Sequence, residues 1–323
     1  MTQPPCVYIL AYRYPFRLPP QLNRRFTARL VAYVASTLFA VLIGLRVQAN
    51  AAAPEQSLAE SPKQSSVAAA IQEKPIQDNS FLIEEAYNQE AGVIQHINFL
   101  TRSWDGDDWE YTFTQEWPFP NRARHQFSYT LPVVRSSEFP GSGTGLGDFL
   151  LNYRYQLSGG GNSRFAFSPR LSLVLPSGDS KRGYGYGSAA VQGNLPVSLV
   201  LNRRWVMHFN AGTTVAPRAQ NEFGDRALAA DSNIGQSLIW LVHPKINLIL
   251  EAVWNSSASV IAPGKTERSH DLFLSPGIRW AHDFGNGLQI VPGVGIALGV
   301  GPSAGEKGLI FYLSLEHPFA NTQ

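Results

Sequence analysis

Apolar and polar side chains alternate through most of the chain, most clearly in its last stretch, Lys307 to Phe319. One face of this stretch carries Leu309, Phe311, Leu313, Leu315, His317 and Phe319, and the other carries Ile310, Tyr312, Ser314, Glu316 and Pro318. A period of two residues with one apolar and one mixed face is typical of a β-strand. The pattern therefore predicts a C-terminal strand.

Eleven segments upstream share this design, so the sequence predicts twelve strands near the length of about 9–11 residues that a tilted membrane strand needs. The clearest alternates Trp109, Tyr111, Phe113 and Trp117 with Glu110, Thr112, Thr114 and Glu116. The twelve are marked by residues 93–99, 109–117, 127–133, 149–157, 165–175, 191–199, 205–215, 234–240, 246–254, 272–280, 288–298 and 307–319. In the first, we expect Val93, Ile97 and Phe99 on one face and His96 and Asn98 on the other.

Connections between these segments alternate in length. Short ones follow the even-numbered strands, at residues 118–122, 158–163, 202–203, 243–244 and 283–287. Longer ones follow odd-numbered strands, at residues 134–144, 176–187, 216–226 and 255–268. Short periplasmic turns and long cell-surface loops produce this rhythm in outer-membrane barrels. Pairing the first strand with the twelfth would leave no exposed edge. We therefore predict an all-β fold, a transmembrane antiparallel up-and-down β-barrel of about twelve strands over residues 91–319.

Composition agrees with a barrel wall. Charged residues make up 15% of the 323-residue chain and aromatic residues 11%, with 28 glycines. Six of the seven tryptophans fall near strand ends, where the aromatic belts of membrane proteins lie; they are Trp109, Trp117, Trp205, Trp240, Trp254 and Trp280. Mean hydropathy is slightly negative, which excludes a polytopic helical membrane protein but fits a barrel, where only alternate residues meet lipid.

Residues 1–49 resemble a secretory signal peptide, with six arginines, no acidic residue, an apolar run over residues 30–45 and small residues at its end. A membrane anchor is the alternative interpretation of this run. Without the leader, 20 basic residues remain against 24 acidic ones, so nothing indicates a nucleic-acid partner. The only cysteine, Cys6, lies in the leader, and the exported chain would therefore have no thiol.

Residues 50–90 are predicted to form a disordered periplasmic tail with a short helix. Ser80 could cap this helix, and Glu84 and Glu85 would lie in its first turn. We favour a simple lead-in to the first strand. The alternative is a small plug in the periplasmic mouth of the barrel.

Glycine-rich stretches could be mistaken for ligand-binding motifs. Residues 141–147 contain four glycines, but no Lys-Ser/Thr pair follows, so a surface loop is the better interpretation than a phosphate loop. Residues 183–187 are likewise expected to form a flexible surface loop, whose tyrosines could contact a ligand. No cofactor and no metal is expected.

The inner faces carry the candidate site residues, which would line the lumen and set its selectivity. They are Glu110, Glu116, Arg124, Asp148, Asn152, Arg154, Arg170, His208, Glu251 and Arg279. Charges buried in a narrow lumen must pair or meet water. An internal salt-bridge network and a polar conduit are both consistent with them, and we expect some of each, with a constricted lumen. For His96 and His208, we prefer a lumen-lining role to a catalytic Ser/His pair.

Three motifs indicate a family resemblance: residues 81–90 (FLIEEAYNQE), residues 147–155 (GDF followed by NYRY) and residues 168–179 (SPR followed by LPSGD). With them the chain resembles the MetA-pathway of phenol degradation family over about residues 80–320. The resemblance implies a bacterial outer-membrane barrel that passes small compounds, with aromatic ones as candidates. It brings no catalytic residues.

We expect a non-enzymatic outer-membrane channel or transporter for small organic solutes, working by passive or facilitated diffusion. A closed structural or surface-binding barrel is the alternative, followed by an outer-membrane hydrolase. The expected partners are outer-membrane lipid, the solute and the barrel-assembly machinery, which would engage the C-terminal strand. The expected route is export through the signal peptide.

Overall fold

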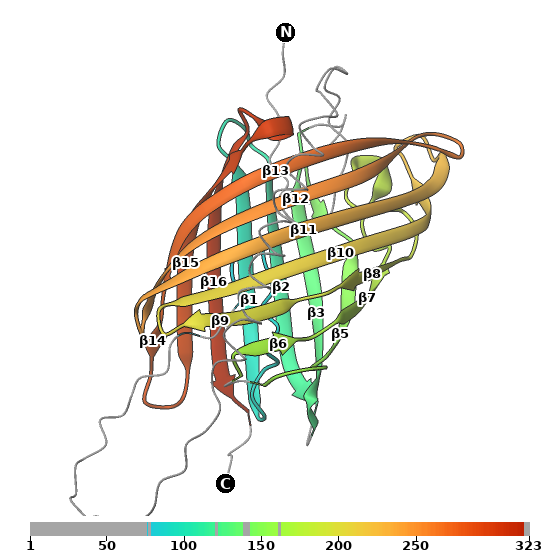
Figure 1. Ribbon diagram of the computed structural model, residues 1–323. Helices are drawn as coiled ribbons and strands as arrows, with labels where there is room; N and C mark the ends of the chain where they lie inside the picture. Colours follow the sequence, from blue (N-terminus) through green and yellow to red (C-terminus); the bar gives the residue numbers. More distant parts are fainter. Residues whose placement is uncertain (1–75, 77–78, 120–121, 138–142, 161–162, 320–323) are drawn as a thin grey trace, which may run out of the picture. The chain divides into compact units, whose positions relative to one another are not determined.

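The computed structural model describes residues 76, 79–119, 122–137, 143–160 and 163–319, which belong to one compact unit. They form a closed antiparallel β-barrel of twelve strands (Figure 1). The prediction of an all-β twelve-stranded barrel is confirmed. The predicted signal peptide over residues 1–49 and most of the predicted tail lie outside the described residues.

Several barrel strands are interrupted, so that β4 and β5, β6 and β7, β8 and β9, and β13 and β14 are pieces of single strands. The pieces are β1 (Val93–Ser103), β2 (Trp109–Phe119), β3 (Arg122–Arg135), β4 (Thr144–Leu146), β5 (Phe149–Tyr155), β6 (Phe165–Phe167), β7 (Arg170–Leu175), β8 (Ala190–Asn194), β9 (Val197–Asn202), β10 (Trp205–Gln220), β11 (Arg226–His243), β12 (Ile246–Ala262), β13 (Lys265–Trp280), β14 (His282–Asp283), β15 (Gln289–Gly299) and β16 (Lys307–Pro318). Two of the interruptions fall at Pro169 and Pro196, which have no N–H to donate to the ladder.

The first and last strands close the barrel. β1 pairs with β16 along its whole length, from Val93 opposite Pro318 to Ser103 opposite Gly308, and with β2 on its other side. Every other barrel strand pairs with its neighbours in the sequence. Closure gives each strand two partners, so no open edge is left for pairing with another chain.

The alternation predicts the two faces of the wall correctly in strands two to twelve. In β2, for example, Glu110 and Glu116 are buried inside, while Trp109, Phe113 and Trp117 face outward. Along β16 the predicted apolar face is the outward one. Ile239 and Leu241 of β11 face inward and pack in an apolar cluster.

The residues of the first strand divide between its two faces as predicted, but the face that meets the lumen is the opposite one, so the predicted lumen-lining role of His96 is wrong. Ile97 and Phe99 are buried inside the barrel, whereas His96 and Asn98 lie on the outer face. The polar groups outside have partners there, since Asn98 Oδ1 accepts a 2.7 Å hydrogen bond from the Tyr111 hydroxyl. The lumen beside this strand is apolar, because Ile97 and Phe99 pack there in a buried hydrophobic cluster.

Four strands run further than predicted. β10 to β13 have 16 to 18 residues each, so the predicted loops at residues 216–226 and 255–268 are largely strand. β12 and β13 are joined through Pro263 and Gly264, and Gly264 has a φ of +69°. Proline followed by a glycine with positive φ is typical of a tight type II turn. The loop at residues 176–187 does leave the strands, as expected, whereas residues 134–135 and 144, at the two ends of the other predicted loop, belong to β3 and β4.

Regular helices are absent from the described residues, which contain only the 3₁₀ turns η1 (Ser180–Arg182) and η2 (Gly301–Ser303). Among these residues, no helix has the length and apolar character needed to cross a membrane.

Candidate functional site: the lumen of the barrel

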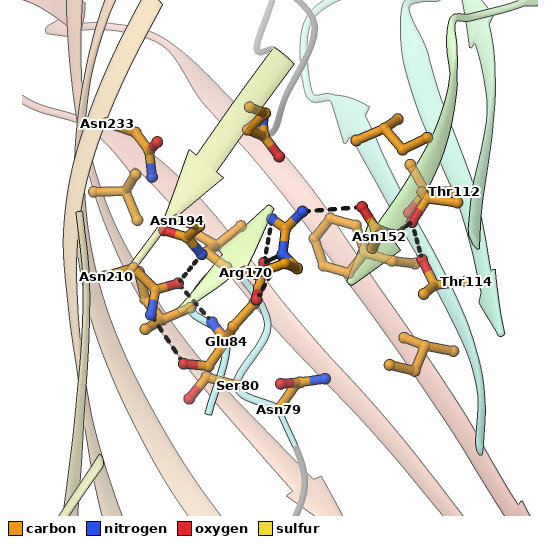
Figure 2. Close-up of a pocket in the computed structure, with 18 of the residues that line it drawn as sticks. Asn79, Ser80, Glu84, Thr112, Thr114, Asn152, Arg170, Asn194, Asn210 and Asn233 are labelled. Atoms are coloured by element: carbon orange, nitrogen blue, oxygen red, sulfur yellow. Dashed lines mark hydrogen bonds and ion pairs between the residues drawn. The ribbon is translucent and has the colours of Figure 1, made fainter. Parts of the chain in front are cut away.

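Residues 79–90, which we call the lumen segment, lie inside the barrel before β1 begins. The residues from Ser80 to Ile83 and from Glu85 to Tyr87 are buried. Figure 2 shows Asn79, Ser80 and Glu84 enclosed by strands of the wall. Residues 80–87 form bends instead of the predicted short helix, and they fill part of the lumen instead of simply leading into β1. The plug, which we favoured less, describes this segment better.

The first half of the lumen segment is held by apolar contacts. Phe81, Leu82 and Ile83 belong to a buried cluster whose other members come from β1 and from β11 to β16; these are Ile97, Phe99, Ile239, Ile249, Val253, Phe273, Ala297, Ile310 and Tyr312. The Phe81 and Tyr312 rings lie 5.7 Å apart between centroids. This cluster explains why Ile97 and Phe99 face inward, since the lumen beside β1 is filled with apolar side chains and not with water.

Inward-facing glycines make room for this half of the segment. A Cβ at Gly277 of β13 or at Gly293 of β15 would overlap the Phe81 ring, and one at Gly235 of β11 would overlap Ile83. The segment thus lies directly on the backbone of the wall. Gly295 of β15 also borders Phe81, since a Cβ there would lie 3.2 Å from the ring.

Side chains of the wall satisfy the backbone amides of the segment, one after another. Glu251 accepts from Leu82 N at 3.0 Å and from Ile83 N at 3.1 Å. Further along, the acceptors are Asn210 for Glu84 N (2.9 Å), Ser198 for Ala86 N (2.7 Å), Gln156 for Asn88 N (2.9 Å) and Gln126 for Gln89 N (2.7 Å). Buried amides need such partners, and here the wall supplies them in place of a helix or a sheet.

Arginines and amides of the wall bind the carbonyl groups in the same way. Arg154 donates to Glu85 O at 3.0 Å and to Tyr87 O at 3.3 Å, and Arg279 donates to Asn79 O. The Ala86 carbonyl accepts from both Gln156 Nε2 (2.7 Å) and Ser168 Oγ (2.6 Å). Two of the predicted lumen-lining arginines therefore hold the segment.

One ion pair binds the middle of the segment, and a second joins two residues of the wall. Arg170 NH2 lies 2.6 Å from Glu84 Oε1, with the two side chains 14% and 28% exposed. Arg170 also donates to Asn152 Oδ1 at 3.0 Å (Figure 2). Arg154 pairs with Glu116 at 3.4 Å, deeper in the wall. The expected internal salt-bridge network is present in this part of the lumen.

A serine and a histidine do meet in the lumen, but in a supporting arrangement. Ser198 Oγ lies 2.7 Å from His208 Nδ1, and both residues are buried. The same oxygen accepts the Ala86 amide, so the lumen segment covers it. Among the described residues no carboxylate is bonded to His208 that could orient it as in a catalytic triad. This geometry suits the anchoring of Ala86, not attack on a substrate.

The remaining predicted site residues lie apart from the segment. Glu110 is buried, and its Oε1 has no hydrogen-bond partner within the described part of the chain. Arg124, near the start of β3, is exposed, unlike the other predicted lumen-lining residues of the wall. Asp148 is fully buried and binds a loop.

That loop, residues 176–189, turns inward, and we call it the inner loop. Asp148 accepts hydrogen bonds from Gly178 N at 2.9 Å and from Tyr186 N at 2.7 Å. The Tyr186 hydroxyl donates to Asp231 of β11 at 2.5 Å, and the Tyr184 hydroxyl donates to Gly143 O at 2.7 Å. Because both tyrosines are buried, the prediction of a flexible surface loop is wrong for this stretch.

A cavity of about 220 Å³ remains beside the lumen segment. Its polar lining consists mainly of neutral groups, among them Thr112, Thr114, Asn152, Asn194, Asn210 and Asn233 (Figure 2). Phe81, Ile97, Phe99 and Tyr312 give it an apolar side. The cavity can therefore accept a small molecule that has both an apolar face and hydrogen-bonding groups.

Sequence reasoning missed several residues of this site. Ser198, Asn210, Gln126 and Gln156 are neutral, and we had selected mainly charged residues of the inner face as candidates. Their inward position was readable from the period of two. Their partners were not, because Ser198 and Ala86 are separated by 112 positions.

Comparisons with known proteins agree with this architecture. Among solved structures, the chain is similar to the COG4313 outer membrane channel from Pseudomonas putida F1, with 13% identity, a TM-score of 0.54, and coverage of 72% of this chain and 97% of that one. A weaker likeness is to the KdgM porin, with 10% identity, a TM-score of 0.45, and coverage of 70% and 99%. No curated protein matches the chain in sequence. The first likeness shows that this chain shares the fold of that protein.

The family is shown by sequence as well. The model of the family described as "Putative MetA-pathway of phenol degradation" matches residues 124–315, more than half of the chain. The chain belongs to this family, and the resemblance seen in its motifs is confirmed.

Proposed function

We propose that the protein is a bacterial outer-membrane channel that passes small organic solutes through its lumen by passive or facilitated diffusion. The observation that carries this proposal is the cavity inside the closed barrel, which is lined mainly by neutral hydrogen-bonding groups and by aromatic and aliphatic side chains, with four charged residues, Glu84, Glu116, Arg170 and Asp231, among them. The description of the Pseudomonas putida protein as an outer membrane channel supports it.

The lumen segment would set the narrowest point of the path. It occupies space beside the cavity, and Arg170 and Arg154, which would otherwise present free cations, are bound to Glu84 and Glu116. With Arg154 and Arg170 paired, this part of the lumen would favour uncharged solutes over anions. Aromatic compounds are candidate solutes because the family takes its name from phenol degradation, and the cavity would hold such a ring against Phe81 and Phe99.

A bilayer experiment tests the proposal directly. The purified, refolded protein is inserted in planar bilayers, and single-channel conductance is recorded with and without phenol, alongside the flux of phenol into liposomes. We expect small, stable conductance steps that phenol reduces. A variant lacking residues 79–90 should give larger steps, because the lumen segment no longer fills the barrel. Deletion of residues 50–61, of equal length but outside the described residues, is the control.

Other outcomes would favour the alternatives. If both the intact protein and the variant lacking residues 79–90 fold but neither conducts nor passes phenol, the protein is a closed structural or surface-binding barrel. The dense bonding of the lumen segment is the observation that favours this second candidate. Labelling of Ser198 by a serine-directed reagent would instead support the hydrolase.

The proposal includes location and assembly. The leader would direct export, the outward apolar face of strands such as β16 would meet lipid, and the last strand, with Phe319 next to its end, would be recognised by the barrel-assembly machinery. Fractionation of cells that express the chain, with and without residues 1–49, tests the location. Replacing Phe319 with alanine tests assembly, and we expect a slower appearance of folded barrel.

A further inference from the structure

Two histidines meet on the outside of the barrel where its first and last strands join. His96 of β1 and His317 of β16 face outward, and their Nε2 atoms are 3.2 Å apart although 221 positions separate the residues. Their ring centroids are 5.3 Å apart with an angle of 22° between the planes. The close nitrogen contact and the larger centroid distance mean that the rings meet edge to edge, with these nitrogens toward each other.

The structure indicates which nitrogen of His317 carries the proton. His317 Nδ1 lies 3.3 Å from the carbonyl oxygen of Pro318. A carbonyl oxygen can only accept, so Nδ1 is the donor and, in the neutral ring, Nε2 keeps its lone pair. A backbone carbonyl that fixes the Nδ1 proton is also the usual support of a histidine that binds metal through Nε2. The other ring is positioned by stacking, because His96 lies on Phe113 with 6.0 Å between centroids and 19° between planes.

The distance between the two nitrogens suits a shared metal ion. Two imidazole nitrogens at about 2.0–2.1 Å from a tetrahedral Zn²⁺ are roughly 3.3 Å from each other. The Nε2 atoms are already at 3.2 Å, so each ring could turn to direct its lone pair at one shared point without a change in the distance between the two nitrogens. His96 would then carry its proton on Nδ1 instead of Nε2, and no proton is gained or lost.

We propose that His96 and His317 form a binding site for a divalent transition-metal ion of the Zn²⁺ class, which links the first and last strands of the barrel. The described residues contain no group of three or more histidine, cysteine, aspartate or glutamate side chains arranged around a metal, so water completes the coordination. Water can reach the site because both histidines lie near an end of their strand. His317 is next to the last residue of β16, and His96 is the fourth residue of β1. Both side chains are only half-buried.

Binding across this junction has a specific consequence. The strand pair β1–β16 is the only pairing between the two ends of the described barrel sequence. A ligand that binds the closed barrel and not the open chain stabilises the closed form in proportion to its occupancy. Zn²⁺ should therefore raise the unfolding temperature of the protein, and chelation should reverse the rise.

The test uses full-length protein without a histidine tag, refolded in detergent micelles and titrated with ZnCl₂ by calorimetry. We expect saturable uptake of one Zn²⁺ at this site and an unfolding temperature raised by a few degrees. His96→Gln and His317→Gln should each lose both effects. Glutamine keeps a hydrogen-bonding group, so these variants should fold, which heat-modifiable gel mobility can verify.

His282→Gln is the control, because His282 is exposed and its ring contacts Phe284 and not a second histidine. This variant should bind Zn²⁺ as the parent does. Cys6 is present in every variant, so any binding by it cancels in the comparison. The proposal is overturned if the parent takes up no more Zn²⁺ than the His96→Gln/His317→Gln double variant, in which case the two histidines form only a hydrogen bond.

Discussion

The two halves of the lumen segment are held by different physical means. Residues 81–83 pack in an apolar cluster against glycines of the wall, whereas residues 84–89 are held by hydrogen bonds and one ion pair. The stabilisation that comes from burying apolar side chains changes little with salt concentration. The attraction within a partly exposed ion pair weakens as the salt concentration rises. The comparison indicates that the first half anchors the segment and the second half is the part that conditions can loosen.

The largest effect is expected from Phe81→Ala. The ring fills the space above Gly277 and Gly293, and loss of a buried phenylalanine costs about 3–5 kcal/mol. Hydrogen exchange of the amides of residues 82–89 measures the loss of docking. We expect faster exchange by a factor that is the same at low and high salt.

Phe223→Ala is the control for this change, since Phe223 is 81% exposed in the loop after β10. It should leave exchange of the segment unchanged. Exchange that depends strongly on salt in Phe81→Ala would contradict the assignment of the first half as an apolar anchor.

Gly277→Ala should have the next largest effect, of about 1–3 kcal/mol, because the new methyl group overlaps the Phe81 ring. Thermal unfolding and hydrogen exchange both report it. Gly193→Ala in β8 is a matched substitution, because a Cβ there has no heavy atom within 4 Å. In the Phe81→Ala background Gly277→Ala should cost much less, since the ring that it meets is gone. Equal costs in the two backgrounds would show that Phe81 does not lie there.

The contrast between the halves also shows what sequence could predict. Alternation reports whether a side chain faces in or out, and this depends only on neighbouring residues of one strand. It therefore placed Arg154, Arg170 and Glu251 correctly inside the barrel. It failed for Ile97 and Phe99, because their inward position depends on Phe81 and Ile83 in the lumen.

The alternation of apolar and polar residues could not predict contacts between residues that are distant in the sequence. Glu251 and Leu82 are 169 positions apart, and nothing local to either residue indicates the hydrogen bond between them. The polar ends of β12 and β13 were mistaken for loops, since they lack the alternation that lipid imposes. One unused signal was the placement of inward-facing glycines at Gly235, Gly277 and Gly293, which indicates that another part of the chain approaches the wall.

Ser198→Ala tests the second half at one hydrogen bond. It removes the acceptor of the Ala86 amide and the partner of His208 Nδ1. Leaving buried polar groups without a partner costs about 1–3 kcal/mol, while the bonds that Ala86 O accepts from Gln156 and Ser168 remain. Hydrogen exchange should accelerate at residues 86–89 and not at residues 82–83. Equal acceleration in both halves would mean that the segment is released as one unit.

The smallest effect is expected for the Glu84–Arg170 ion pair. A double-mutant cycle with Glu84→Gln and Arg170→Gln isolates the coupling between the two side chains. Their partial exposure of 28% and 14% places the coupling at about 1 kcal/mol or less, and it should shrink at high salt. The cycle is measured by hydrogen exchange of the segment at two salt concentrations.

The pair Asp179–Arg182 serves as the reference for this cycle. Its atoms are 3.5 Å apart and its side chains are 50% and 56% exposed, so its coupling should be close to zero. A coupling at Glu84–Arg170 above this reference that falls with salt would establish that the second half responds to ionic conditions. A coupling no larger than the reference would mean that the neutral hydrogen bonds of Asn210, Ser198 and Gln156 hold the second half of the segment instead. Salt would then not change how firmly the segment is bound in the lumen.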